Sequence, residues 1–311
     1  MSRLIHASLL TLSALTLSAA QADEGVYEIS PLCVATGCFD GDAPGWPVTL
    51  SNPGRYVLTG NLDVRNEADP VNTDAIVIGS IAGRVDITLD LNGFEIRGPV
   101  TCTGTPVTSC SAGAGQGDGI TVTNNVRLTV RQGAIVGMGN IGVRCASVSA
   151  SCRIEDVRVE QNRQDGITGS AGLGVTIRNV SAQNNGGSGI VMVRGSIRDS
   201  LVRGNAANGL SAGLGSVDSV DALNNGQDGI VSSGPVSNSN AENNNQDGIN
   251  CFSCIATGNR ASSNGRFGLR LNNGSVYGSN LLSFNDSSDL NTLGPAFDVE
   301  SAPNLCNDGS C

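Results

Sequence analysis

Residues 226–251 read GQDGIVSSGPVSNSNAENNNQDGINC, and the tetrapeptide Gln-Asp-Gly-Ile occurs in them twice, nineteen residues apart. Two explanations are open. The two aspartates could form a catalytic or metal-binding pair, or the tetrapeptide could mark a structural unit that is repeated along the chain. The sequence on either side decides which explanation comes first.

The glycine of this tetrapeptide recurs, each time followed by an aliphatic residue, at spacings of 19 to 24 residues. These glycines are Gly119, Gly142, Gly166, Gly189, Gly209, Gly229, Gly248 and Gly268. An asparagine stands four positions before six of them, as Asn162, Asn185, Asn205, Asn225, Asn244 and Asn264. Small or branched apolar residues stand seven and twelve positions before the same glycines. This phase, kept over more than one hundred residues, indicates a repeat architecture.

The repeating unit has the pattern of short β-strands. Residues 175–180, VTIRNV, alternate aliphatic and polar side chains, as a strand with one buried face does. A unit of about twenty residues with two or three short strands is typical of one coil of a parallel β-solenoid. Leucine-rich repeats have a similar length, but they require a leucine framework that this chain lacks. The predicted fold class is therefore all-β.

Stacking of coils explains the choice of residues. Equivalent side chains in successive coils are expected to lie about 4.8 Å apart, so the six asparagines should form a hydrogen-bonded ladder of side-chain amides. Each repeated glycine is expected to adopt a left-handed turn conformation, which other residues adopt only at a cost.

The chain divides into a leader, two caps and one solenoid. Residues 1–22 have the layout of a secretory signal peptide, with Arg3, an apolar run and an expected cleavage after Ala22. We predict an N-terminal cap at 23–50, a β-helix at 51–288 with a projecting disulfide loop at about 99–117, and a C-terminal cap at 289–311. After this cleavage the mature protein is predicted to be secreted or periplasmic. No later stretch is long and apolar enough to span a membrane.

The cysteines support export. All ten fall into close sequential pairs, and an even number in an oxidising compartment indicates disulfides. The short spacings favour the pairs Cys33–Cys38, Cys102–Cys110, Cys145–Cys152, Cys251–Cys254 and Cys306–Cys311. Cys251 and Cys254 have the spacing of a redox motif, but the strand and helix setting of such motifs is missing, so a structural bridge is expected there.

Residue types that the chain lacks restrict its chemistry. It contains no lysine, and its one histidine, His6, lies in the signal peptide. A mature protein without either has no imidazole base and no Schiff-base amine, so acid–base work could be done only by Asp, Glu, Tyr or Arg. The net charge of −10 disfavours nucleic acid as a partner.

The stretch ITLDLNGFEIRG at 87–98, followed by coils of the Asn-x-x-x-Gly-Ile kind, resembles the secreted bacterial right-handed parallel β-helix repeat proteins of the pectin lyase-like superfamily. The resemblance covers nearly the whole mature chain and implies a right-handed parallel β-helix with coils of about 19–24 residues. For function it implies polysaccharide lyases, polygalacturonase-type hydrolases, epimerases, phage tailspikes or adhesin-like proteins without known activity.

Asp228 and Asp247 are the first candidate site. One coil apart, they would face water, share a proton, or hold Ca²⁺. Their spacing suits a retaining glycosidase pair better than an inverting one. Polygalacturonase-like enzymes are inverting and carry Gly-His-Gly and Arg-Ile-Lys motifs that are missing here, so their catalytic residues are not transferred. We interpret the two aspartates first as turn residues, with calcium binding and catalysis as the alternatives.

Arg178 and Arg198 are the second candidate site. They stand at equivalent positions of successive coils, between Glu155 and Asp218. Such a row can neutralise itself as a ladder of charges. The alternative is that one arginine is the base of a lyase, as in pectate lyase-like enzymes, which this row resembles. Those enzymes also need an acidic calcium cluster, and the sequence does not place one beside the arginines.

Two classes of function remain. We predict a non-catalytic extracytoplasmic solenoid that binds a polysaccharide or another cell-surface component, with no required cofactor other than a possible Ca²⁺. The alternative is a polysaccharide lyase or glycoside hydrolase that uses Asp or Arg on one face.

Overall fold

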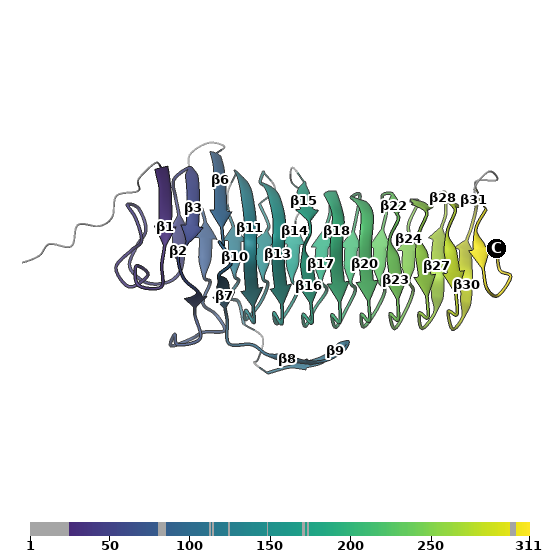
Figure 1. The fold of residues 1–311 in the computed structure, drawn as a ribbon, viewed down its shortest axis with the longest axis horizontal. Coiled ribbons are helices and arrows are strands. Elements are labelled where there is room, and N and C mark those ends of the chain that lie inside the picture. Colours follow the sequence, from purple (N-terminus) through teal and green to yellow (C-terminus); the bar gives the residue numbers. More distant parts are fainter. Residues whose placement is uncertain are drawn as a thin grey trace, which may run out of the picture.

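Parallel strands stacked in coils make up the computed structural model, which describes residues 25–79, 85–111, 113, 115–123, 125–147, 149–169, 172, 174–298 and 303–311. The predicted signal peptide lies outside the described residues. Figure 1 shows an elongated solenoid along which the chain advances coil by coil from β1 to β32. The described residues form no α-helix, and so none that could cross a membrane.

Two parallel sheets form the walls of the solenoid. The larger sheet contains β1 (Val26–Ile29), β3 (Gly54–Leu58), β4 (Leu62–Asp63), β6 (Val85–Asp90), β7 (Glu95–Arg97), β11 (Val126–Val136), β13 (Ser151–Glu160), β15 (Val175–Arg178), β16 (Ser181–Gln183), β18 (Gly195–Arg203), β20 (Ser216–Leu223), β22 (Val236–Ser237), β23 (Asn240–Glu242), β25 (Ile255–Thr257), β26 (Arg260–Ser262), β28 (Ser275–Gly278), β29 (Leu281–Ser283), β31 (Ala296–Asp298) and β32 (Leu305–Cys306).

The smaller sheet is built from strands that mostly have three residues. It contains β2 (Val48–Leu50), β5 (Ile76–Ile78), β10 (Ile120–Val122), β12 (Val143–Cys145), β14 (Ile167–Gly169), β17 (Ile190–Met192), β19 (Leu210–Ala212), β21 (Ile230–Ser232), β24 (Ile249–Cys251), β27 (Phe267–Asn272) and β30 (Ser288–Leu293). The residue after each repeated glycine occupies the same place in this sheet, as in the pair Ile230 and Ile249. Side chains at these places fill one narrow core between the sheets.

The asparagines lie buried at the turn that follows the larger sheet, in one continuous ladder. Asn225 Nδ2 donates to Asn244 Oδ1 at 2.9 Å and to Val202 O at 3.1 Å, and Asn225 Oδ1 accepts from the backbone and side chain of Asn205. The same pattern runs from Asn162 onward and extends past Asn264 to Asn285, one coil beyond the predicted ladder. Each amide thus joins three coils.

The left-handed conformation predicted for the repeated glycines is wrong, because none of the eight repeated glycines has a positive φ. Glycine is required there by close packing. A Cβ on Gly229 would lie 2.6 Å from both Gly248 O and Asn244 Nδ2 in the next coil. The left-handed residues stand instead just before the ladder asparagines, for example Asn224 with φ 55° and Asn243 with φ 56°. Asparagine tolerates this region better than most residues.

The segment at 99–117, predicted as a projecting loop, leaves its coil and then runs along the side of the solenoid towards the C-terminal end. β8 (Cys102–Gly104) and β9 (Val107–Cys110) form an antiparallel hairpin, here called the arm, that lies along the turns of the following coils (Figure 1). Val107 N donates to Gly204 O at 2.9 Å, and Cys102 Sγ lies 3.6 Å from Gln161 O. The arm therefore bridges several coils.

Five disulfides are present, and they leave no free cysteine in the described chain. They join Cys33 to Cys38, Cys102 to Cys110, Cys145 to Cys152, Cys251 to Cys254, and Cys306 to Cys311. All are local links inside one coil, loop or end segment.

The two ends differ. At the N-terminal end, Tyr27 stacks on Tyr56 at 4.8 Å between ring centroids and Phe39 meets both rings, so aromatic side chains close the core. β1 and β2, which fall inside the predicted cap, already pair with strands of the coils. β31 and β32 of the predicted C-terminal cap do the same. The cap boundaries at 50 and 289 stay predictions.

Candidate functional site

Asp228 and Asp247 are brought together by the stacking of β21 and β24, but they do not face solvent. Asp247 is fully buried and Asp228 is 7% exposed. Asp228 Oδ1 accepts from Asp247 N at 2.9 Å, and Asp247 Oδ1 accepts from Phe267 N at 3.3 Å. Each carboxylate thus receives a backbone N–H from the coil that follows it.

The same bond recurs at other acidic residues of this row. Asp118 Oδ1 accepts from Ile141 N at 3.0 Å, and Asp165 Oδ1 accepts from Ser188 N at 2.7 Å. The recurrence indicates that an aspartate before the repeated glycine serves the turn, because a buried N–H without a partner is destabilising.

The remaining oxygens of the pair are also occupied. Asp228 Oδ2 accepts from Asn250 Nδ2 at 3.0 Å, and Asp247 Oδ2 accepts from Arg270 at 3.3 Å, with Arg266 Nε 3.7 Å from Asp247 Oδ1. Burial, with a further contribution from Asp228, raises the pKa of Asp247 above its usual range. A calcium ion or a substrate would have to displace these bonds, so the calcium and catalytic hypotheses for this pair stay predictions without further support.

Arg178 and Arg198 lie on the outer face of the larger sheet. The register places them in one row with Glu155 and Asp218, in β13, β15, β18 and β20. Their side chains are 53% and 58% exposed, and the Nε atoms of Arg178 and Arg198 are 3.8 and 4.0 Å from Asp199 Oδ2. These are long contacts, so both guanidinium groups remain able to bind a ligand.

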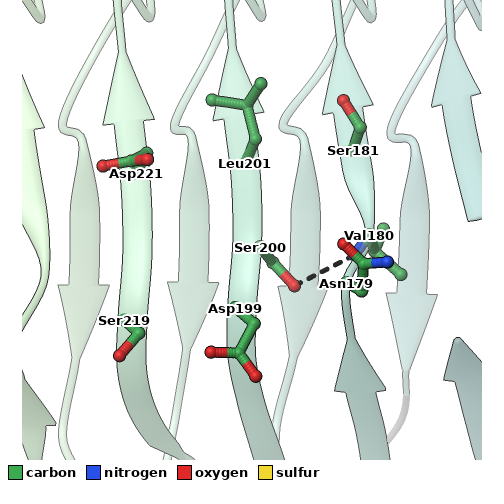
Figure 2. Close-up of a pocket in the computed structure, with 8 residues that line it drawn as sticks. All are labelled: Asn179, Val180, Ser181, Asp199, Ser200, Leu201, Ser219 and Asp221. Carbon is green, nitrogen blue, oxygen red and sulfur yellow. Dashed lines mark hydrogen bonds between the residues drawn. The ribbon is translucent and has the colours of Figure 1, made fainter. Parts of the chain in front are cut away.

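Two adjoining hollows lie beside this row. One, of about 280 Å³, is lined by Asn179, Val180, Ser181, Asp199, Ser200, Leu201, Ser219 and Asp221 (Figure 2). The other, of about 290 Å³, is lined by Glu155, Asp156, Arg178, Asn179 and Asp199. Because the hollows share Asn179 and Asp199, they form one shallow depression across successive coils, here called the outer groove.

A bend in the larger sheet creates the outer groove. Asn179, Asp199 and Ser219 stand at equivalent places with φ of 49°, 51° and 55°, so the chain turns outward there in each coil. Beneath the bend, Ser200 Oγ accepts from Val180 N at 3.2 Å, the bond drawn in Figure 2. Short side chains at the bend leave the space above them open.

Hydrogen bonds position several acidic groups around the groove. Asn179 Nδ2 donates to Asp156 Oδ1 at 2.7 Å, and Arg153 binds Glu155 at 2.9 Å. Hydrogen bonds from Asn238 and Ser237 lower the pKa of Asp218. The groove thus offers guanidinium donors and carboxyl acceptors side by side.

The repeat pattern did not identify Asn179, Asp199 and Asp221 as groove residues. A signal was present at the bend, because asparagine and aspartate recur at this place in Asp156, Asn179 and Asp199, and both tolerate the left-handed region. A second amide ladder at the same bend was also missed. There Asn259 Nδ2 donates to Asn280 Oδ1 at 3.1 Å, and Asn280 Nδ2 to Asn304 Oδ1 at 2.9 Å.

Comparison with known proteins agrees with this architecture. The sequence profile described as "Right handed beta helix region" matches residues 100–225. The A-module of the mannuronan C-5 epimerase AlgE6 of Azotobacter vinelandii superposes with a TM-score of 0.63 at 16% identity, covering 90% of this chain and 88% of that one. The chain is a right-handed parallel β-helix.

Two further structures are similar to the β-helix. The Agl-KA catalytic domain gives a TM-score of 0.55 at 12% identity and covers 91% of this chain but 57% of that one. The pectate lyase Pel9A gives 0.50 at 15% identity and covers 92% and 80%. No curated protein matches the β-helix in sequence. At such low identity these likenesses establish the fold alone.

Proposed function

We propose that the protein is an extracytoplasmic polysaccharide-binding β-helix that holds an acidic glycan in the outer groove. The observation that carries the proposal is the stack of Arg178 and Arg198, exposed and loosely engaged with Asp199, beside a hollow that crosses coils. The five disulfides fit an oxidising compartment outside the cytoplasm.

The chemistry of the groove selects the class of ligand. Guanidinium groups bind carboxylates through paired hydrogen bonds, and two of them about 4.8 Å apart suit a polymer that carries a carboxylate on successive units. Asp199 and Asp221 can accept hydrogen bonds from sugar hydroxyls. A mannuronan epimerase and a pectate lyase are among the similar structures, and this makes uronate polymers the first to test.

Binding without catalysis is the function that the geometry supports best. The groove is shallow. In the arginine row, the pKa of Asp218 is lowered, which suits a hydrogen-bond acceptor and not a general acid. A lyase with Arg178 or Arg198 as base is the second candidate, favoured by the exposure of both groups beside Asp199.

Affinity electrophoresis through gels that contain polygalacturonate, alginate or neutral dextran tests the proposal. We expect retardation by a uronate polymer and a loss of affinity of about tenfold or more in Arg178→Ala/Arg198→Ala. Arg127→Ala is the matched control, because Arg127 is also exposed on the larger sheet but is paired with Asp86 at 2.7 Å. Equal retardation of both variants, or none by any uronate polymer, contradicts the proposal.

The same polymers distinguish binding from catalysis. Unsaturated uronates absorb in the ultraviolet and hydrolysis yields reducing ends, so incubation with wild-type protein reports either activity. Product that disappears in Arg178→Ala would establish the enzyme in place of the binding protein.

A further inference from the structure

The outer face of the larger sheet changes character toward the C-terminal end. In the central coils one outward row reads Arg153, Thr176, Ser196 and Ser216. In the last coils the same row reads Ile255, Val276 and Phe297. Ile255 is 50% and Phe297 60% exposed, although both are large apolar residues.

A second outward row changes in the same coils. Leu281 of β29 and Leu305 of β32 follow Arg260 in register and are 46% and 65% exposed. Between the two apolar rows lie small residues, among them Thr257 and Gly278. We call the surface of Ile255, Val276, Phe297, Leu281 and Leu305 the C-terminal apolar face.

The C-terminal apolar face ends at strands without a second neighbour. Within the described residues β31 pairs only with β28 and β32 only with β29. An edge of this kind offers unpaired backbone groups to another strand. Apolar side chains beside an open edge are a combination that favours association with another chain.

We propose that this face joins two copies of the protein tail to tail around a two-fold axis. The exposed parts of its side chains amount to roughly 450 Å², so two copies would bury about 900 Å², which is the range of a weak, reversible interface. A two-fold contact is self-complementary, and the bulky rows of one copy can lie over the small residues between the rows of the other.

Charge restricts how the copies overlap. Farther along the same outer face lie the exposed Arg178, Arg198 and Asp199, and the chain has a net charge of −10. Side-by-side packing over the full length would bury these charges, which is unfavourable. Overlap limited to the last coils avoids this and leaves both outer grooves exposed.

Sedimentation velocity of the mature protein from about 5 to 500 µM tests the proposal, in the affinity range expected for such an interface. We expect a dimer whose fraction rises with concentration and whose frictional ratio exceeds that of the monomer, because the copies meet end to end. Phe297→Ser/Leu305→Ser should sediment as a monomer throughout. Leu32→Ser, at an 87% exposed residue near the other end, should dimerise as the wild type does.

A wild-type protein that stays monomeric at 500 µM overturns the proposal. So does a dimer that persists in Phe297→Ser/Leu305→Ser, or one with a lower frictional ratio than the monomer, which indicates side-by-side packing. Thermal unfolding of each variant checks the fold, and these exposed positions should leave the midpoint nearly unchanged.

Discussion

Gly229 shows at the scale of one residue why the repeat is so strict. A methyl group there would lie 2.6 Å from the carbonyl oxygen of Gly248 and from the amide nitrogen of Asn244. The oxygen accepts from Ile230 N and the nitrogen donates to Asn264 Oδ1, so neither can move without breaking a hydrogen bond between coils. The glycine is therefore required by its neighbours in the next coil, whereas its own backbone angles are ordinary.

Replacing Gly229 by alanine should destabilise the protein by about 2 kcal/mol or more, because the added Cβ overlaps backbone of the next coil. Chemical denaturation followed by circular dichroism measures the change. Gly113→Ala is the control, since a Cβ at Gly113 meets no atom within 4 Å. Equal loss of stability in both variants would contradict close packing as the reason for the glycine at position 229.

Asp247 gives the protein an unusual dependence on pH. The pKa of Asp247 is raised, which means that the folded state favours the neutral carboxyl more than the unfolded state does. This contribution to stability is therefore present below the ordinary pKa of an aspartate and is lost as pH rises through the raised pKa. The stability of Asp247→Asn relative to wild type should therefore increase as pH rises from about 4 to about 7.

Asp308 supplies the opposite control. Backbone and side-chain hydrogen bonds lower its pKa to about 2, so its contribution is present above 3.8 and is lost as pH falls through about 2. Asp308→Asn should lose stability relative to wild type as pH rises from about 2 to about 4, the window between the pKa of Asp308 in the folded state and in the unfolded state. Thermal midpoints of the three proteins at each pH measure both trends, and parallel curves for the two variants contradict the assignment.

At the scale of elements, the arm is the least repetitive part and the one that links most coils. Val100 N donates to Gly137 O at 2.8 Å near its base, and Val107 N reaches Gly204 O near its tip. A Cβ on Gly186 would lie 2.8 Å from Cys110 Sγ, so the turn beneath the arm must be small.

Removing the arm's disulfide with Cys102→Ser/Cys110→Ser should loosen the turns that it covers. We expect faster hydrogen–deuterium exchange around Gly186 and Ala206, whose N–H groups bond to Asn162 O and Asn185 O. Exchange around Gly226 and Gly265, in turns beyond the arm, should not change. A uniform increase along the whole chain would mean that the arm stabilises the protein globally.

The sequence predicts those residues that stacking constrains, and it does not predict those that stacking leaves free. Asn225 and Gly229 are buried against the next coil in every repeat, so their spacing is visible in the sequence. Asp199 and Phe297 point outward, where neighbouring coils impose no common residue, and the outer groove could not be located from spacing alone. The path of the arm depends on contacts between Val107 and Gly204, nearly one hundred residues apart, which no local pattern records.

At the scale of the molecule, the β-helix is a sum of nearly equivalent coils, each held mainly by its two neighbours. The coil between Asn225 and Asn244 is bonded to the coils on both sides through the same ladder atoms. If this coil were removed, Asn225 would face Asn264, and Asn225 Nδ2 could donate to Asn264 Oδ1 as it now does to Asn244 Oδ1.

Deletion of residues 226–244 should yield a folded protein shortened by about 4.8 Å. Small-angle scattering measures the length, and circular dichroism with thermal unfolding checks the fold. Deletion of residues 226–235, half a coil, shifts every later residue out of register and should abolish cooperative unfolding. Similar behaviour of the two deletions would contradict the independence of the coils.

The ladder also bears on how the protein ages. Asn185, Asn225 and Asn264 are each followed by glycine, the sequence most prone to deamidation, in which the glycine nitrogen attacks the side-chain carbon and a succinimide forms. Here the three side chains are fully buried, and the nitrogens of Gly186, Gly226 and Gly265 each bond to a carbonyl of the preceding coil at 2.8 Å. Deamidation at these sites therefore requires a turn to open first. The rate at which aspartate and isoaspartate accumulate there would measure how often each turn unfolds locally.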